Sequence, residues 1–158
     1  MADILVIGYG NELRGDDGLG PLVAKSVAAA DIPGVRVLSV RQLLPEFAAD
    51  LAQARLVVFV DASDAWSESG VEVRSLAAET ATDWCTHRAD PRTLLALTRT
   101  IYGQTPEAWW LTASGRNFDF GEGLSGVAEE NARQALACLK RLILPKTQRE
   151  PHPLTRHE

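Results

Sequence analysis

Two neighbouring carboxylates near the start of the chain and a third in its middle are the side chains best suited to chemistry. Asp16 and Asp17 close a glycine-rich loop, and Asp61 follows the apolar run at 56–60. Adjacent like charges raise each other's pKa unless a cation or a hydrogen-bond donor compensates. One carboxylate, with Asp16 as the candidate, is expected to cap the helix that begins near Leu19. Asp17 is then the better candidate for a cation ligand.

The elements that must position these acids are two strands. The runs at 4–7 and 56–60 are aliphatic or aromatic without a polar partner, which is typical of central parallel strands covered on both faces. In open α/β sheets ligands bind beyond the carboxyl ends of the strands. Because each run is followed by an acidic loop, Asp17 and Asp61 are expected at the same edge of the sheet.

A nitrogen ligand could complete this set. His152 and His157 lie near the C-terminus, so His87 is the histidine expected within the folded domain. An imidazole with the carboxylates of Asp17 and Asp61 would suit nickel or zinc and would leave coordination positions open. The alternative for His87 is a loop histidine bonded to solvent or backbone, and the spacing alone favours that alternative.

The remaining pattern alternates strands with helices. Further strands are expected at 35–40, 71–76 and 108–112, and helices at 19–30, 43–51, 91–102 and 124–144, the last stopped by Pro145. This order predicts a single α/β domain over residues 1–145, with a twisted, mostly parallel sheet of about five strands and helices on both faces. Residues 146–158 have almost no apolar anchors and are expected to form a flexible tail.

Composition narrows the class of protein. The chain has 158 residues and a net charge of −5, which argues against general binding to nucleic acid or to an anionic membrane. No apolar run approaches the length of about 20 residues that crosses a bilayer, and the N-terminus lacks a signal pattern. Cys85 and Cys138 belong to no paired metal motif. A cytoplasmic location is expected.

Other catalytic and binding motifs fit poorly. Gly8 and Gly10 begin a dinucleotide fingerprint, but Leu13 stands where the third glycine belongs, and the acidic pair would repel phosphate. No metalloprotease helix and no serine-nucleophile elbow is present. Ser114 and Ser125 have no histidine partner in sequence, so a serine hydrolase is not expected.

The glycine-rich acidic loop combines a set of residues at fixed spacing, namely Gly8, Gly10, Asn11, Leu13, Asp16, Asp17, Gly18 and Gly20. This pattern strongly resembles the N-terminal signature of the nickel-iron hydrogenase maturation endopeptidases. Asp61 matches the family's second acidic position, and 118–125 is similar to a loop found before the last helix in one branch. The resemblance extends over about residues 1–144.

This resemblance implies a cytoplasmic protease, expected to be a monomer, that removes a C-terminal extension from a hydrogenase large-subunit precursor after nickel insertion. The nickel belongs to the substrate and is recognised by two acids and a histidine, which correspond here to Asp17, Asp61 and His87. Either carboxylate could act as the general base. The isolated protein is expected to need no metal of its own. The segment 118–124 is expected to contact the precursor.

Two departures from the family pattern affect the ligand set. Many members have glutamate at the position of Asp17, and a well-characterised branch has its histidine directly after the proline that opens a helix, where this chain has Arg92. His87 instead lies four residues before Pro91, as in other members. The alternatives left open are a non-catalytic nickel-binding assembly factor on the same fold and a nucleotide-binding α/β protein.

Overall fold

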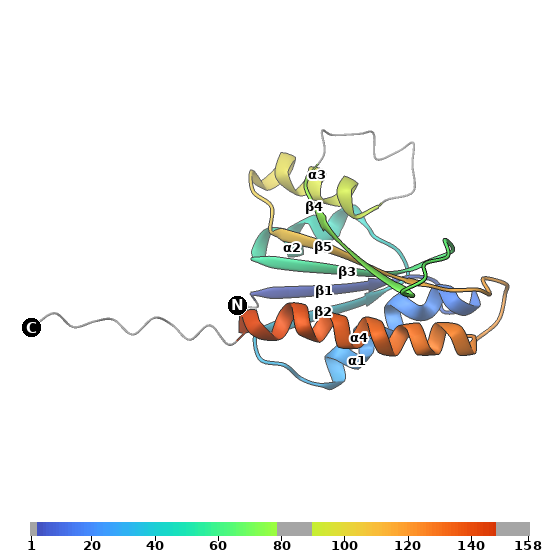
Figure 1. Cartoon of the computed structure of the whole chain (residues 1–158). Coiled ribbons are helices and arrows are strands. Elements are labelled where there is room, and N and C mark those ends of the chain that lie inside the picture. Colours follow the sequence, from blue (N-terminus) through green and yellow to red (C-terminus); the bar gives the residue numbers. More distant parts are fainter. Residues whose placement is uncertain (1–2, 79–89, 148–158) are drawn as a thin grey trace, which may run out of the picture.

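A five-stranded sheet forms the centre of the computed structural model, which describes residues 3–78 and 90–147 (Figure 1). The strands lie in the order β2-β1-β3-β5-β4, and all neighbours are parallel except β4, which is antiparallel to β5. Their bounds are β1 (Ile4–Tyr9), β2 (Val35–Val40), β3 (Leu56–Ser63), β4 (Val71–Leu76) and β5 (Glu107–Ser114).

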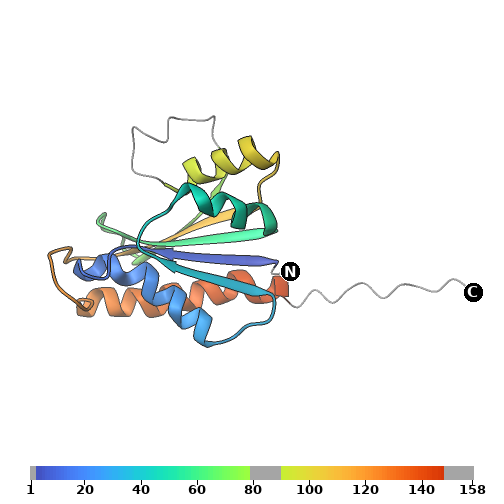
Figure 2. The same cartoon turned by 180° about the vertical axis from the view of Figure 1, so that it is seen from behind.

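Helices cover both faces of this sheet, as Figures 1 and 2 show from opposite sides. One face carries α1 (Leu19–Ala29) and α4 (Gly126–Thr147), and the other carries α2 (Ala48–Gln53) and α3 (Pro91–Tyr102). Short 3-10 turns at Gly15–Gly18 and Pro45–Phe47 precede α1 and α2. The predicted α/β class, with a mostly parallel sheet covered on both faces, is therefore confirmed.

Burial on both faces explains the continuous apolar run of β1. Ile4 and Val6 pack into the core under α1 and α4, whereas Leu5 and Ile7 pack into the core under α2 and α3. All four are at most 2% exposed. A strand buried on both sides cannot alternate apolar and polar residues, because successive side chains point to opposite faces.

Glycine allows α1 to begin directly against β1. A Cβ atom at Gly8 would lie 2.1 Å from the backbone oxygen of Gly20, and one at Gly20 would lie 2.5 Å from that of Tyr9. Neither position has space for a side chain. The close approach holds the acidic loop between β1 and α1 against the carboxyl end of the sheet.

The start of α3 is fixed by its cap. The side chain of Asp90 accepts hydrogen bonds from the backbone N–H groups of Arg92 and Thr93, and Pro91 occupies the first helical position. Gly103 ends the helix in the left-handed conformation, with φ of 77°.

Two details differ from the expectations. β3 continues past the apolar run, so Asp61 lies inside the strand rather than beyond it, because β5 extends equally far and pairs with it up to Ser63. Pro145 does not stop α4, which continues to Thr147. A proline this close to the end of a helix removes only one N–H bond and does not prevent a further half-turn. The rest of the expected tail, 148–158, lies outside the described residues.

The structure also bears on the two cysteines and on membrane-spanning helices. Cys138 is partly buried against the core of α1 and α4, as a small apolar residue would be, whereas Cys85 lies outside the described residues. Among the helices in 3–78 and 90–147, none has both the length and the apolar character that a bilayer crossing requires.

Candidate functional site

Two loops meet at the carboxyl edge of the sheet and hold each other in place. The loop at 11–18 follows β1, and the loop at 115–125 joins β5 to α4. Gly15 donates a backbone hydrogen bond to Gly121 at 2.9 Å, and Gly121 donates one to Leu13 at 2.8 Å. These bonds place the acidic pair beside a segment that lies about a hundred residues later in the chain.

Asp16 joins the two loops through its side chain. One carboxylate oxygen accepts from the N–H groups of Arg116 and Asn117, at 2.7 and 2.9 Å, and from the Ser125 hydroxyl at 2.7 Å. The other oxygen accepts from the Ser125 N–H, also at 2.7 Å. Asp16 is fully buried. Burial alone would raise its pKa, but these four donors outweigh burial and hold the pKa below the ordinary value.

The expectation that Asp16 caps α1 is therefore wrong. The N-terminus of α1 has no side-chain cap, because Gly18 occupies that position and the Asp16 carboxylate is turned toward 116–125. Asp16 helps instead to fix the start of α4. Ser125, which it binds, accepts a hydrogen bond from the Ala128 N–H at 3.2 Å, as an N-cap residue does.

Asp17 points in the other direction. One of its carboxylate oxygens accepts a hydrogen bond from the backbone N–H of Asn11 at 2.7 Å, and the side chain is partly exposed. A Cβ atom at Gly10 would lie 2.0 Å from the Asp17 backbone oxygen, so only glycine allows the loop to fold back this tightly. This fold leaves the Asp17 carboxylate facing open space.

Asp61 lies at the same open space, on β3. Burial has the largest effect on its pKa and raises it, and the negative charge of Asp17 raises it further. Hydrogen bonds from the Tyr9 hydroxyl and the Ala62 N–H act in the opposite direction, and the resulting pKa is about 7. Burial, and then the charge of Asp61, also raise the pKa of Tyr9, so this phenol stays protonated and donates to the carboxylate. Near neutral pH, Asp61 can accordingly accept or release a proton.

The open space consists of two adjoining cavities of about 500 and 560 Å³. Asp17 and Asp61 line both of them, together with Arg14 and Trp110. The structure thus brings together the two acids that the sequence analysis selected. The first cavity also includes Phe118 and Arg74, and the second also includes Tyr9 and Asp90.

Sequence reasoning missed several of these lining residues. Trp109 and Trp110 face opposite sides of the sheet, as adjacent residues of a strand do, but nothing in the sequence indicated that Trp110 would line the cavities. Its buried indole nitrogen lies near the Tyr9 hydroxyl without hydrogen-bond geometry and has no partner among the described residues. Tyr9 could have been found, because it directly follows the register pair Gly8 and Val60 and so lies beside Asp61.

The expected metal ligands are only partly placed. His87 lies outside the described residues, and within 3–78 and 90–147 no group of three or more His, Cys, Asp or Glu side chains could hold a metal ion. Arg92, at the position where one family branch has histidine, lies over the ring of Trp110, with its guanidinium 5.9 Å from the ring centre. The start of α3 therefore borders the cavities.

The two serines considered as nucleophiles have structural roles. The Ser114 hydroxyl donates to the backbone oxygen of Ala65 at 3.0 Å, and the Ser125 hydroxyl donates to Asp16. Neither serine lines the two cavities around Asp17 and Asp61. Both hydroxyls are therefore engaged away from the candidate site.

Solved structures share this overall fold. The crystal structure of a nickel-iron hydrogenase maturation protease, HycI from Thermococcus kodakarensis KOD1, aligns with a TM-score of 0.68, covering 90% of this chain and 93% of that one at 23% identity. This chain has the fold of the hydrogenase maturation proteases. HybD of Thermococcus kodakarensis, another such protease, aligns with a TM-score of 0.67 over 88% of this chain and 97% of its own, at 20% identity.

A bacterial hydrogenase maturation protease gives the same result. The hydrogenase maturating endopeptidase HybD from E. coli aligns with a TM-score of 0.64, covering 90% of this chain and 93% of its own at 18% identity. No protein-family model and no curated protein sequence matches the chain. The fold comparison agrees with the maturation-protease resemblance of the glycine-rich acidic loop.

Proposed function

We propose that this protein is an endopeptidase that removes the C-terminal extension of a nickel-iron hydrogenase large-subunit precursor after nickel insertion. The substrate-bound nickel would be recognised by Asp17, Asp61 and His87. The observation that carries the proposal is the convergence of Asp17 and Asp61 on shared cavities, in a fold whose solved examples are named hydrogenase maturation proteases. The protein is proposed to act as a cytoplasmic monomer.

The electrostatics of the two acids favour a cation between them. The charge of Asp17 contributes to the raised pKa of Asp61, so the two carboxylates repel each other in the protein alone. A divalent cation would remove this repulsion and favour both ionised forms. Carboxylates with one imidazole make an open site, which suits a metal that arrives on a partner protein.

Chain reach supports His87 as the third ligand. Asp90, which lines the larger cavity, lies three residues after His87. Three residues of extended chain span up to about 10 Å, so an imidazole this close in sequence to a lining residue can reach the cavity. The proposal therefore assigns the nitrogen ligand to His87 and leaves Arg92 on the ring of Trp110.

Asp61 is the proposed general base. In peptide hydrolysis a water oxygen bonds to the carbonyl carbon while the base takes the water proton, and the C–N bond then breaks as the nitrogen is protonated. A base with a pKa near the working pH is best suited to accept and return that proton. In the protein without a bound cation the pKa of Asp61 is about 7, close to this requirement, and the hydrogen bond from Tyr9 favours the ionised form that accepts the proton.

The test is incubation of the protein with a nickel-loaded large-subunit precursor, with product masses measured by mass spectrometry. Loss of a C-terminal peptide is expected with nickel-loaded precursor and not with nickel-free precursor. Asp17→Ala, Asp61→Ala and His87→Ala should each abolish or strongly slow cleavage. Glu46→Ala, an exposed change away from the lining residues of the two cavities, serves as the control.

Failure of this test has distinct meanings. Nickel binding without cleavage of any precursor would favour a non-catalytic assembly factor. Thermal stabilisation by nucleotides, unaffected by Asp17→Ala, would favour a nucleotide-binding protein instead. Cleavage that persists in His87→Ala would remove that residue from the ligand set while leaving the protease assignment in place.

A further inference from the structure

A third hollow lies behind the acidic loop, on the side away from the Asp17 and Asp61 carboxylates. It measures about 460 Å³ and lies between the 11–18 loop, α1 and the segment that leads into α4. We call it the leucine groove, and the residues that define it are Leu13, Leu22, Leu124, Glu12, Glu122 and Glu129.

The leucine groove continues along the two helices of that face. An adjoining hollow of about 340 Å³ shares Leu22 and Glu129 with it and extends over Val23, Ala132 and Leu136 of α1 and α4. The two hollows together follow the surface between α1 and α4. This adjoining hollow, unlike the leucine groove itself, is also lined by Arg133, which is paired with Glu130.

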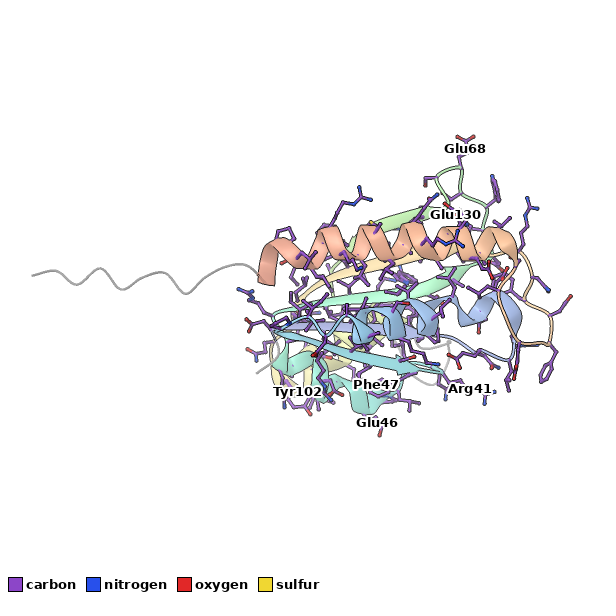
Figure 3. All side chains as sticks on the ribbon, turned by 90° about the horizontal axis from the view of Figure 1, so that it is seen from below. Arg41, Glu46, Phe47, Glu68, Tyr102 and Glu130 are labelled. Carbon is purple, nitrogen blue, oxygen red and sulfur yellow. The ribbon has the colours of Figure 1, made fainter. Side chains whose placement is uncertain are left out.

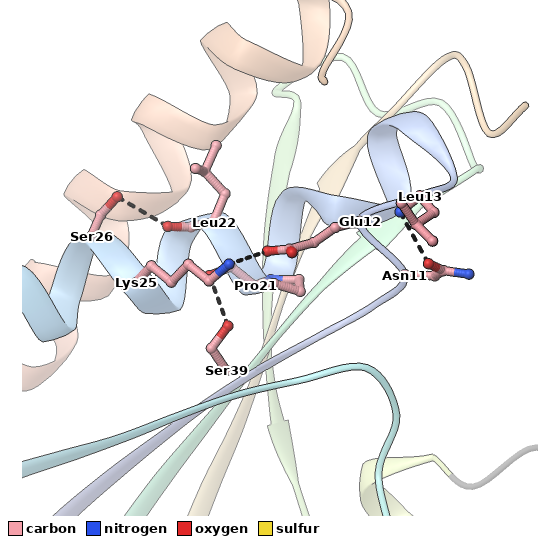
Figure 4. Close-up of polar contacts among 8 residues, drawn as sticks. All are labelled: Asn11, Glu12, Leu13, Pro21, Leu22, Lys25, Ser26 and Ser39. Atoms are coloured by element: carbon pink, nitrogen blue, oxygen red, sulfur yellow. Dashed lines mark hydrogen bonds and ion pairs between the residues drawn. The ribbon is translucent and has the colours of Figure 1, made fainter. Parts of the chain in front are cut away.

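Its apolar side chains are unusually accessible. Leu13 is 45% exposed and Leu22 is 44% exposed, and Phe120, in the neighbouring loop, is 83% exposed. Apolar residues gathered in this way, rimmed by charges, mark sites of protein association more often than single exposed leucines do. Figure 4 shows Leu22 and Lys25 leaving α1 on different sides, and Lys25 is not among the residues that line the groove.

The charge of the groove has one sign. Its three glutamates are not matched by any basic residue among its lining residues. Glu12 is paired with Lys25 (Figure 4). The carboxylates of Glu122 and Glu129 have no ion pair or hydrogen bond within the part of the chain that the structure describes. A partner with lysine or arginine next to aliphatic side chains would complement both properties.

The groove and the candidate active site share one wall. Leu13 and Gly15 face the groove, while Arg14 and Asp17 of the same loop face the cavities. A protein bound in the groove would therefore contact the loop that carries Asp17. This position allows one partner to occupy both places.

We propose that the leucine groove docks a basic, aliphatic segment of the substrate protein, separate from the residues at the bond that is cut. The inference rests on the proposed function for the identity of that protein, the hydrogenase large-subunit precursor. Docking orients the precursor so that its C-terminal region enters the cavities at Asp17 and Asp61. It contributes to substrate binding and not to the chemical step.

The test compares Glu122→Gln/Glu129→Gln with the wild type on nickel-loaded precursor. Loss of two exposed charge pairs is expected to raise the KM and the Kd for the precursor about three- to tenfold, with kcat unchanged. Leu22→Ala should raise both constants as well. Higher salt should weaken binding to the wild type and should affect the double variant less.

The matched control is Glu46→Gln/Glu68→Gln. Both glutamates are exposed, and Figure 3 shows them at opposite edges of the molecule. This control should leave the KM, the Kd and kcat unchanged. Binding is measured directly as well as through cleavage, so that an absence of cleavage, which would defeat the proposed function, remains distinct from an absence of docking.

Three outcomes would overturn the docking proposal. The first is precursor binding that neither Glu122→Gln/Glu129→Gln nor Leu22→Ala weakens. The second is a loss of kcat in the double variant at an unchanged Kd. The third is a dimer of the protein alone in sedimentation experiments, dissociated by Leu22→Ala, because a second copy would then occupy the groove.

Discussion

Asp16 binds both the backbone N–H and the hydroxyl of Ser125, at 2.7 Å each, although 109 residues separate them in sequence. Asp17, the next residue, makes no such contact and faces the cavities. Two adjacent residues of one type therefore have different functions in the structure. One joins two loops, and the other is available to a ligand.

Neutral substitutions of these two aspartates are expected to affect different properties, stability for Asp16 and cleavage for Asp17. Asp16→Asn places an amide group among four donors and should lower the free energy of unfolding by about 2–4 kcal/mol. Asp17→Asn should change it by less than about 1 kcal/mol but should abolish precursor cleavage. Urea denaturation and the cleavage assay measure the two properties. Equal destabilisation by both variants would contradict this division of roles.

The stability contribution of Asp16 should depend on pH. Its pKa in the folded protein is below the ordinary value for an aspartate, so the unfolded chain binds the proton more readily. The stabilisation is then complete above about pH 5 and decreases as the pH falls through the folded pKa. The difference in unfolding free energy between wild type and Asp16→Asn, measured by urea denaturation from pH 7 to pH 2.5, should shrink below about pH 4. A constant difference would contradict the role of the charged form.

Asp61→Asn is expected to stabilise the protein while removing its activity. Burial and the charge of Asp17 disfavour the ionised Asp61 carboxylate, and the isosteric amide can still accept the Tyr9 hydrogen bond. At pH 8, above the pKa of about 7, the variant should gain about 1–3 kcal/mol in unfolding free energy. At pH 5 the gain should be smaller, because the wild-type residue is then protonated. A loss of stability at pH 8 would show that its charge is compensated in the free protein.

Gly8→Ala tests the close approach of α1 to β1. The added methyl group would meet the Gly20 backbone oxygen at 2.1 Å, and a backbone atom cannot move aside without shifting the helix. Destabilisation of about 2 kcal/mol or more is expected, together with reduced cleavage.

Gly126→Ala is the matched control for that change. Nothing lies within 4 Å of the atom it adds, and it lies in the first turn of α4. Its unfolding free energy should be unchanged or up to about 1 kcal/mol higher. Thermal unfolding of both variants gives the comparison, and similar losses for both would rule out the proposed cause.

Much of this fold could be predicted from local patterns. The β1 run, the Asp90 cap of α3 and the alternation of Trp109 and Trp110 all follow from residues close in sequence. The placement of Asp17 and Asp61 at one sheet edge also followed from the strands that precede them. Burial on both faces made these strands recognisable.

Contacts between distant segments could not be predicted in the same way. Nothing near Asp16 indicated that its partners would be residues 116, 117 and 125, so a local helix cap was the natural expectation. The end of β3 was misplaced because its last residues are held by pairing with β5 rather than by their own apolar character. Both errors arise where tertiary contacts outweigh local preference.

The bonds from Asp16 to the segment that leads into α4 also bear on the order of folding. They close loops of 100 and more residues, and such long-range contacts form only after their entropic cost has been met by other structure. We expect these contacts to be among the last to form. A chain interrupted before α4 would contain Asp17 and Asp61 but would lack the completed wall between the leucine groove and the cavities. Recognition of a precursor would therefore be delayed until synthesis of the domain is finished.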